Sequence, residues 1–205
     1  MTERPKGMSL KEFFSLVWWD WHINRGITFD RLRSMLLLLE IRWEQFIYRN
    51  CYRPRNPLTL IWYLTRFLGS IFQWVIATSI IPGDAEIGRG LRLPHPQNII
   101  VTRLAKIGDF CTLYQNVSIA LNGFNPTKAP RLGDRVMLGT GSIVIGDITI
   151  GSDVIVSAGA VVLRSVPDHA RVISPRPTVI TDYPSRDPAE PGSKRHIEDP
   201  YSLWR

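Results

Sequence analysis

A single histidine offers the clearest chemistry in this sequence. His95 lies between Pro94 and Pro96, and the two prolines restrict the backbone around it. A neutral imidazole held beside a groove can remove a proton from a hydroxyl group as a general base. The alternative is a surface or interface histidine. The four histidines of the chain are too dispersed for a metal-binding spacing, and we expect no metal site.

The histidine lies in a stretch where an aliphatic residue returns at every sixth position. The cleanest run is Leu132, Leu138, Val144, Ile150, Val156 and Val162, and the earlier runs are Ile81, Ile87 and Leu93, then Val101, Ile107, Leu113 and Ile119. Neither a helix nor a simple strand repeats every six residues, so the pattern predicts a parallel β-helix whose aliphatic side chains point inward. Glycine at the second place of a unit, as at Gly108 and Gly133, is expected to permit the tight corner. His95 follows Leu93 by two residues and should point outward or along a corner.

Two breaks interrupt the repeat. One is two residues near Ile99, and the other inserts seven residues between Ile119 and Leu132. The second break predicts a loop at residues 120–131, which a coil can eject without disturbing its neighbours. Loops on rigid scaffolds often carry function, so this loop is a candidate binding element.

Composition limits the class of protein. The 205 residues are 44% hydrophobic, carry a net charge of +7 and contain only Cys51 and Cys111. Two cysteines give no disulfide framework, and no signal peptide is visible, so we expect a reducing, cytoplasmic setting. The positive charge suits an anionic cofactor, nucleic acid or a membrane surface, or simply a solvated basic surface.

The first 80 residues are expected to be helical. Ser9 and Glu12 have the spacing of a capping box and predict a helix over residues 10–21. A second helix is expected over residues 30–49, and Asn56 is expected to cap a third over residues 57–79. The apolar stripe predicted for the second helix is Leu32, Met35, Leu36, Leu39, Trp43 and Phe46. The β-helix domain is expected at residues 81–180, with a mobile tail at residues 181–205.

The third helix is unusually apolar. Arg66 is its only charge between Leu58 and Ile81, and Arg53 and Arg55 precede it. Three interpretations stay open, namely a helix buried against the rest of the protein, a helix lying in a membrane interface, and a membrane-spanning helix. The interfacial interpretation predicts peripheral contact with the inner face of the cytoplasmic membrane through residues 57–79.

Four segments carry a family resemblance: IGRGLRLPH at 87–95, AKIGDFCTLYQNVSI at 105–119, APRLGDRVMLG at 129–139 and GSDVIVSAGAVVLRSVP at 151–167. Their order and spacing over residues 78–175 resemble the serine acetyltransferase family of hexapeptide acyltransferases, most closely its capsule and exopolysaccharide (colanic-acid-type) branch. The resemblance implies a left-handed β-helix, a homotrimer, and acetyl-CoA in the groove between neighbouring β-helices. It also places His95 on the family's catalytic histidine.

The resemblance suggests further residues that contact acetyl-CoA. The small segments at 138–141 and 157–160 match places where the family lets the pantetheine arm approach the backbone, although ordinary corner geometry would explain them too. The candidates are Gly139, Thr140, Ala158 and Gly159, with Arg164 and Arg176 as candidates for the phosphates.

Three departures from the serine-specific enzymes bear on the acceptor. Ile80 and Pro94 stand where those enzymes have aspartates, and Ala129 stands where they have a second histidine. We therefore expect acetyl transfer to a hydroxyl of a saccharide or glycolipid, with no nucleic-acid partner. The loop side chains suited to that acceptor are Asn122, Phe124, Asn125 and Lys128. The alternatives are a serine O-acetyltransferase and a non-catalytic β-helix scaffold.

Overall fold

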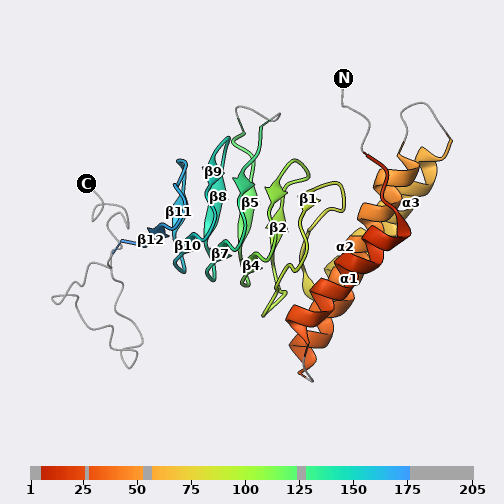
Figure 1. Cartoon of the computed structure of the whole chain (residues 1–205), viewed down its shortest axis with the longest axis horizontal. Coiled ribbons are helices and arrows are strands. Elements are labelled where there is room, and N and C mark those ends of the chain that lie inside the picture. The colour runs from red at the N-terminus through yellow and green to blue at the C-terminus, as the bar shows by residue number, and fades with distance from the viewer. Residues whose placement is uncertain (1–5, 26–27, 53–56, 124–127, 176–205) are drawn as a thin grey trace, which may run out of the picture. The chain divides into compact units, whose positions relative to one another are not determined.

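Three helices precede twelve short strands in this computed structural model, which describes residues 6–25, 28–52, 57–123 and 128–175 (Figure 1). The helices are α1 (Leu10–Asn24), α2 (Phe29–Cys51) and α3 (Thr59–Ala77). The strands are β1 (Glu86–Ile87), β2 (Ile100–Val101), β3 (Lys106–Ile107), β4 (Thr112–Leu113), β5 (Ser118–Ala120), β6 (Arg131–Leu132), β7 (Met137–Leu138), β8 (Ile143–Ile145), β9 (Thr149–Ile150), β10 (Ile155–Val156), β11 (Val161–Val162) and β12 (Arg171–Val172).

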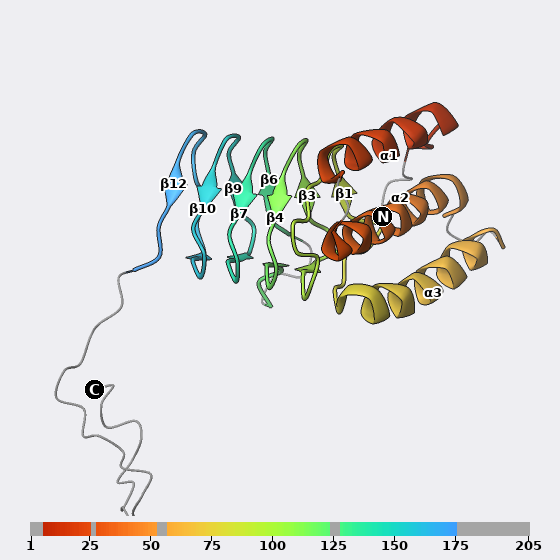
Figure 2. The ribbon, with the colours of Figure 1, turned by 90° about the horizontal axis from the view of Figure 1, so that it is seen from below.

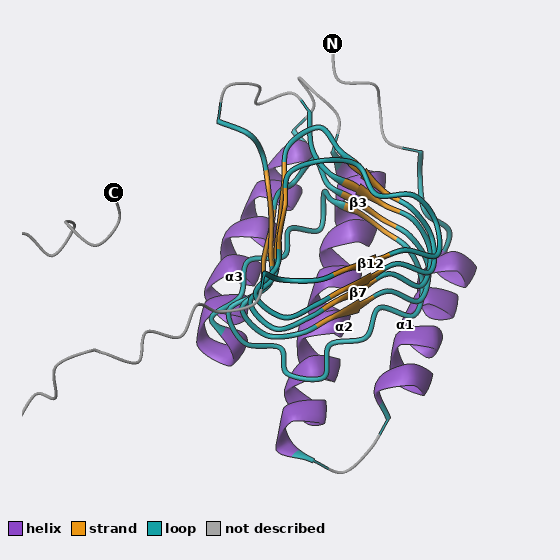
Figure 3. Ribbon diagram, turned by 90° about the vertical axis from the view of Figure 1, so that its left-hand side faces the viewer, coloured by secondary structure: helices purple, strands orange, loops and turns teal. Residues whose placement is uncertain are grey.

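The strands form the three sides of stacked triangular coils (Figure 3). The sheet orders are β1-β3-β6-β9, β12-β10-β7-β4 and β11-β8-β5-β2, and neighbouring strands pair in parallel. The chain visits the three sheets in turn, and each coil lies on the preceding one. The predicted left-handed parallel β-helix is confirmed.

The inward positions predicted from the repeat form the core. Leu113, Ile119 and Leu138 are fully buried, as are the small inward residues Cys111 and Ser142. Burying one such aliphatic side chain contributes about 1.5–3 kcal/mol, so the column of inward residues stabilises the stack of coils.

The glycines at the second place of the units have a different role from the one predicted. Positive φ angles occur instead at residues such as Phe110 and Arg135, at 58° and 56°, and Gly108 is not among them. A Cβ atom on Gly108 would lie 2.5 Å from the carbonyl oxygen of Gly133 in the next coil. These glycines therefore allow successive coils to stack closely.

The three helices lie side by side across the first coil of the β-helix (Figures 1 and 2). The predicted Ser9 cap is confirmed, because the Glu12 backbone N–H donates to Ser9 Oγ at 3.1 Å. Helix α3 begins at Thr59, two residues later than predicted, and Leu58 occupies its N-cap without a side-chain hydrogen bond. The predicted cap Asn56 and the flanking Arg53 and Arg55 lie outside the described residues.

The prediction for the buried face of α2 is wrong. Leu32, Leu36, Leu39 and Trp43 of the predicted stripe are exposed, and Leu37, Leu38 and Ile41 are buried in their place. The helix is turned about its axis relative to the prediction so that polar side chains face the β-helix, because the first coil presents free backbone groups that need hydrogen-bond partners. These side chains are Ser34, Arg42 and Gln45.

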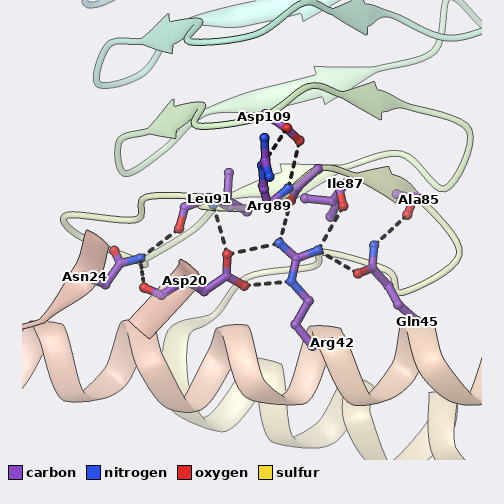
Figure 4. A network of polar contacts seen from close by, with 10 residues as sticks. Asp20, Asn24, Arg42, Gln45, Ala85, Ile87, Arg89, Leu91 and Asp109 are labelled. Carbon is purple, nitrogen blue, oxygen red and sulfur yellow. Dashed lines mark hydrogen bonds and ion pairs between the residues drawn. The ribbon is translucent and has the colours of Figure 1, made fainter. Parts of the chain in front are cut away.

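A buried arginine joins α1, α2 and the first coil (Figure 4). The Arg42 guanidinium pairs with the Asp20 carboxylate at 2.6 Å and donates to the carbonyl oxygens of Ile87 and Gly88 at 2.9 and 2.5 Å. Gln45 Nε2 adds a hydrogen bond to the Ala85 carbonyl at 3.1 Å. The helices therefore satisfy the open end of the β-helix with side chains.

Helix α3 packs against the rest of the protein on one side and is exposed on the other. Among the described residues it is the one helix that is long and apolar enough to cross a membrane, judged by length and composition, and 22% of its most apolar stretch is buried. Gly69 and Gln73 are buried, whereas Phe67 and Trp74 are exposed. The interpretation of α3 as a buried helix therefore holds for one side only.

Candidate active site

His95 lies in the turn between the bridge residue Arg92 and strand β2, and its side chain is 51% exposed. The outward placement predicted for this side chain is confirmed. Its Nδ1 atom lies 3.1 Å from Oδ2 of Asp30, in the first turn of α2. The other carboxylate oxygen of Asp30 accepts a hydrogen bond from Gln97 Nε2 at 3.1 Å. One aspartate therefore contacts residues on both sides of Pro96.

Side chains from the helices hold the segment before His95 in place. The Asn24 amide pairs with this segment as a strand would, because its Nδ2 donates to the Leu91 carbonyl at 2.8 Å and its Oδ1 accepts from the Leu93 N–H at 3.1 Å. Ser34 Oγ donates to the Leu93 carbonyl at 2.5 Å. The segment is thereby attached to both α1 and α2, and Asp30 is brought to the imidazole.

The segment after His95 is held by Ser79. Ser79 is buried, donates to the Pro96 carbonyl at 2.6 Å and accepts from the Ile99 N–H at 2.9 Å. The backbone on both sides of His95 is therefore fixed. A histidine on a fixed backbone loses little conformational freedom when it reacts, which favours catalysis.

The electrostatics suit a base. Hydrogen bonds from His95 and then Gln97 hold the pKa of the Asp30 carboxyl below its ordinary value. A carboxylate that accepts the Nδ1 proton of a neutral imidazole leaves Nε2 free to accept a proton and stabilises the imidazolium that forms. Asp30 and His95 can therefore act together on a hydroxyl group.

A cavity of about 290 Å³ opens beside the imidazole. Its wall includes His95, the Asp30 carboxylate and the guanidinium-bearing residues Arg31 and Arg92. A carboxylate and two cations in one small cavity suit an acceptor that carries both an ammonium and a carboxylate group.

The turns that stack on the His95 turn make a continuous edge, which we call the histidine corner: residues 94–98, 114–116, 139–141 and 157–159. One backbone hydrogen bond joins each turn to the next, from Asn116 to Gln97 at 3.1 Å, from Gly141 to Gln115 at 3.0 Å and from Gly159 to Thr140 at 2.9 Å. The structure therefore brings four predicted cofactor residues to the same corner as His95. They are Gly139, Thr140, Ala158 and Gly159.

The histidine corner is open to a long ligand. A Cβ atom on Gly141 would meet no atom within 4 Å, and one on Gly159 would meet only Ser174 Oγ at 3.9 Å. Coils are spaced by about 4.8 Å, so the ledge from the His95 turn to the Gly159 turn is roughly 14 Å long. The glycines at 141 and 159 leave the backbone of the last two turns available to an extended molecule.

Asn122, Lys128 and Arg164 lie at a different corner, which we call the loop corner: residues 120–123, 128–131, 146–147 and 163–165. Lys128 Nζ pairs with Asp147 there at 2.8 Å, and Arg164 and Asn122 are exposed. The histidine corner precedes and the loop corner follows the strands of the sheet β11-β8-β5-β2, so the two corners lie at opposite ends of these strands. Phe124, Asn125 and Arg176 lie outside the described residues.

Asp30 is the site residue that sequence reasoning missed. It is 65 residues from His95 along the chain, whereas the family resemblance offers an orienting acid only at the positions of Ile80 and Pro94. Acidic residues are common in the first turn of a helix, where they interact favourably with the helix dipole. The position of Asp30 in the sequence therefore did not indicate a catalytic partner. Among the described residues, no cluster of three or more His, Cys, Asp or Glu side chains could hold a metal ion.

Comparison with known proteins agrees with this geometry. Residues 129–164 match the family model described as bacterial transferase hexapeptide (six repeats). The serine acetyltransferase of Helicobacter pylori is 34% identical over 134 residues, which are 64% of this chain and 78% of that protein. That of Staphylococcus xylosus is 32% identical over 132 residues, which are 64% of this chain and 58% of that protein.

Solved structures show the same fold. The serine acetyltransferase of Neisseria gonorrhoeae in complex with serine superposes with a TM-score of 0.66 at 20% identity, covering 80% of this chain and 67% of that chain. The soybean serine acetyltransferase apoenzyme gives a TM-score of 0.66 at 23% identity, with the same coverage.

These relatives overturn the expected acceptor class. The saccharide or glycolipid function is wrong, because the relatives are serine acetyltransferases and none of those reported above is a capsule or exopolysaccharide enzyme. The prediction rested on Ile80, Pro94 and Ala129 as lost acceptor contacts, whereas Asp30 supplies a carboxylate beside His95 from α2. The prediction of an acyltransferase enzyme is confirmed. With the corner geometry and a relative matched over most of its length, the chain belongs to the serine acetyltransferase family.

Proposed function

We propose that this protein is a serine O-acetyltransferase, which moves the acetyl group of acetyl-CoA to the hydroxyl of L-serine. The observation that carries the proposal is the Asp30–His95 pair at the mouth of a charged cavity. His95 Nε2 takes the hydroxyl proton as the serine oxygen attacks the thioester carbonyl. The carbon–sulfur bond then breaks, and the leaving thiolate takes the proton from the imidazolium to give CoA and O-acetylserine.

The cavity supports an amino-acid acceptor. Arg31 and Arg92 offer guanidinium groups to a carboxylate, and Asp30 offers a carboxylate oxygen near an ammonium. Such groups favour a ligand that carries both charges over one that lacks them, because each charge finds an opposite partner beside His95. The charged side chains around His95 thus supply part of the polar contacts to the acceptor that Ile80, Pro94 and Ala129 cannot make.

The histidine corner supports acetyl-CoA as the donor. An acyl donor with a long flexible arm can lie along the ledge formed by Thr140, Gly141, Ala158 and Gly159 with its thioester toward His95. Arg164 and Lys128 belong to the loop corner, at the opposite ends of the strands of one sheet, so one protomer does not place them on this ledge. We therefore propose a homotrimer in which the loop corner of one protomer faces the histidine corner of its neighbour.

The test is thiol release from acetyl-CoA with L-serine as acceptor and mass detection of O-acetylserine. L-Alanine, which lacks the hydroxyl, is the matched control, and we expect no turnover with it. Thiol release with L-serine at the rate seen with L-alanine would contradict the proposal.

The variant His95→Asn tests the base. We expect about a hundred-fold or greater loss of turnover with the β-helix intact, because general-base catalysis contributes about 10²–10⁴-fold and the exposed ring has no core packing. The same substitution at the exposed His169, in the last coil, is the control and should leave turnover unchanged. Turnover of His95→Asn within threefold of wild type would remove His95 from the mechanism and restore the non-catalytic scaffold.

A further inference from the structure

Helix α3 exposes an apolar side. Its large apolar side chains that face solvent occupy about half of the helix circumference: Leu60, Ile61, Tyr63, Leu64, Phe67, Leu68, Ile71, Phe72, Trp74 and Val75. Their exposed surface is on the order of 1,000 Å², whereas the largest apolar patch on a typical monomer is about 300–600 Å². A surface of this size and character indicates contact with another phase or molecule.

Polar bonds prevent α3 from turning this side inward. Gln73 donates to the Ile81 carbonyl at 2.9 Å and accepts from the Ile81 N–H at 2.7 Å, and it is fully buried. Arg66 pairs with the buried Glu44 of α2 at 3.2 Å. The polar side of α3 is therefore its inner side, and the apolar side is held outward.

The apolar surface continues across the layer of helices. A groove of about 400 Å³ is lined by Phe13 of α1, Leu36, Leu39 and Trp43 of α2 and Phe72 of α3. Trp21 of α1 shares a second apolar cavity with Leu36. We call the exposed apolar side chains of α3 together with Leu32, Leu36, Leu39, Trp43, Phe14, Trp18 and Trp21 the apolar face.

Few negative charges border the apolar face. Among the described residues of the three helices, the exposed charged side chains are Lys11, Glu12 and Arg31, and Glu12 is neutralised by Arg49 at 2.8 Å. Glu40 lines the groove, but burial raises its pKa to about 8, so it is largely protonated at neutral pH. The surroundings are therefore neutral or cationic, which complements an anionic surface.

We propose that the apolar face docks the protein on the surface of a lipid bilayer with anionic headgroups, with α3 lying in the interface. Crossing the bilayer would place the Arg66 guanidinium and the Gln73 amide in hydrocarbon without their partners, which is costly. Tyr63 and Trp74 are exposed on α3 and have the amphipathic rings that favour the headgroup level. The proposal does not depend on the acceptor of the acetyl group.

A bilayer suits this face better than a second copy. The apolar face is on the order of 2,000 Å², within the range for one side of an obligate dimer interface, so its shape rather than its area favours lipid. Its apolar side chains also extend around α3, which packs on α2 at the edge of the layer (Figure 2). Lipid can cover such a curved edge completely.

Flotation of the full chain with lipid vesicles tests the proposal. We expect the protein to float with phosphatidylcholine vesicles that contain phosphatidylglycerol, and to bind less as salt rises. The variant Trp74→Glu should reduce the bound fraction at least tenfold. The matched control is Ile173→Glu, because Ile173 is 72% exposed, close to the 67% of Trp74, and lies on the last coil away from the helices; it should bind as wild type does.

A second measurement needs no variant. Brominated phospholipids should quench the tryptophan fluorescence of the wild-type protein, because Trp18, Trp21, Trp43 and Trp74 all belong to the apolar face. Failure to float at every phosphatidylglycerol content, or equal binding of Trp74→Glu and wild type, would overturn the proposal. A larger wild-type assembly without vesicles that Trp74→Glu splits, together with no flotation, would assign the face to a second copy instead.

Discussion

At the residue scale, the Asp30–His95 contact decides the chemistry. We expect Asp30→Asn to lower kcat by about ten- to a hundred-fold with a smaller effect on the KM for acetyl-CoA, since an amide neither accepts the Nδ1 proton as strongly nor stabilises an imidazolium. The Nδ1 proton resonance of His95 should move in the same variant, which a merely structural role would not require. Asp109→Asn, at an exposed ion pair with Arg89, is the control and should leave kcat unchanged. Unaltered kcat in Asp30→Asn would exclude the positioning role.

A glycine between coils makes a second residue-scale prediction. We expect Gly108→Ala to destabilise the protein by about 1–3 kcal/mol, because the new Cβ would lie 2.5 Å from a carbonyl oxygen of the next coil, where backbone must shift. Gly123→Ala is the control, since a Cβ there meets nothing within 4 Å. Chemical unfolding measures both. Equal stabilities for the two variants would show that the coils are not closely stacked at Gly108.

Sequence reasoning succeeded where residue type reports local environment. The six-residue period identified Leu113, Ile119 and Leu138 as inward because burial selects aliphatic side chains at each turn of the repeat. It missed Asp30 because a contact between residues 65 positions apart depends on how α2 lies against the first coil. Periodicity within a segment contains no information about that placement.

At the element scale, the buried pair of Arg42 and Asp20 fastens the helices to the β-helix (Figure 4). We expect Arg42→Met to cost about 3–5 kcal/mol of unfolding free energy, because the buried Asp20 carboxyl would lose its arginine partner. Adding Asp20→Asn should recover part of that loss. The control Arg135→Met breaks an exposed pair with Asp153 and should cost about 1 kcal/mol or less. Losses of equal size in Arg42→Met and Arg135→Met would contradict this account.

The junction of α2 and α3 should make stability depend on pH. Burial, then the nearby Glu44 carboxylate, raises the pKa of Glu40 from 4.5 to about 8, while Gln73 and Arg66 oppose the rise. Between these two values the folded state holds a proton that the unfolded state releases, so the free energy of unfolding should fall as pH rises from about 5 to about 8.

The variant Glu40→Gln measures this contribution. It should show a flatter dependence of the unfolding free energy on pH over the same range, since its side chain has no proton to lose. Glu86→Gln, at an exposed ion pair on β1, is the control and should keep the wild-type slope. A wild-type slope in Glu40→Gln would assign the pH dependence to other groups.

For the helices, the sequence predicted the bounds well but the buried face of α2 wrongly. All three were predicted near their observed bounds, because caps and apolar periodicity are local signals. The buried side of α2 was predicted wrongly because hydrophobicity alone favours burying Leu36 and Trp43, whereas the backbone groups of the first coil require Arg42 and Gln45. The apolar side chains left on the outer face of the helices are those that we propose contact a bilayer.

At the scale of the whole molecule, the two corners raise the question of how one site is assembled. His95 and Lys128 lie at opposite ends of the strands of the sheet β11-β8-β5-β2, so a groove that uses both must form between protomers. Cyclic symmetry would repeat that contact at each of three interfaces. The arrangement makes each site dependent on two chains.

Mixed trimers test this dependence. We expect His95→Asn and Lys128→Glu each to be inactive alone, the first without its base and the second with an anion where the neighbour's groove needs a cation. Coexpression should restore activity, because an interface that takes its histidine corner from the Lys128→Glu chain and its loop corner from the His95→Asn chain is intact. Random mixing of equal amounts makes about one interface in four intact, so about a quarter of wild-type activity should return. Mixing the two purified homotrimers without subunit exchange is the control and should restore nothing. If coexpression restores no activity while mass measurement shows mixed trimers, the site does not combine His95 of one protomer with Lys128 of its neighbour.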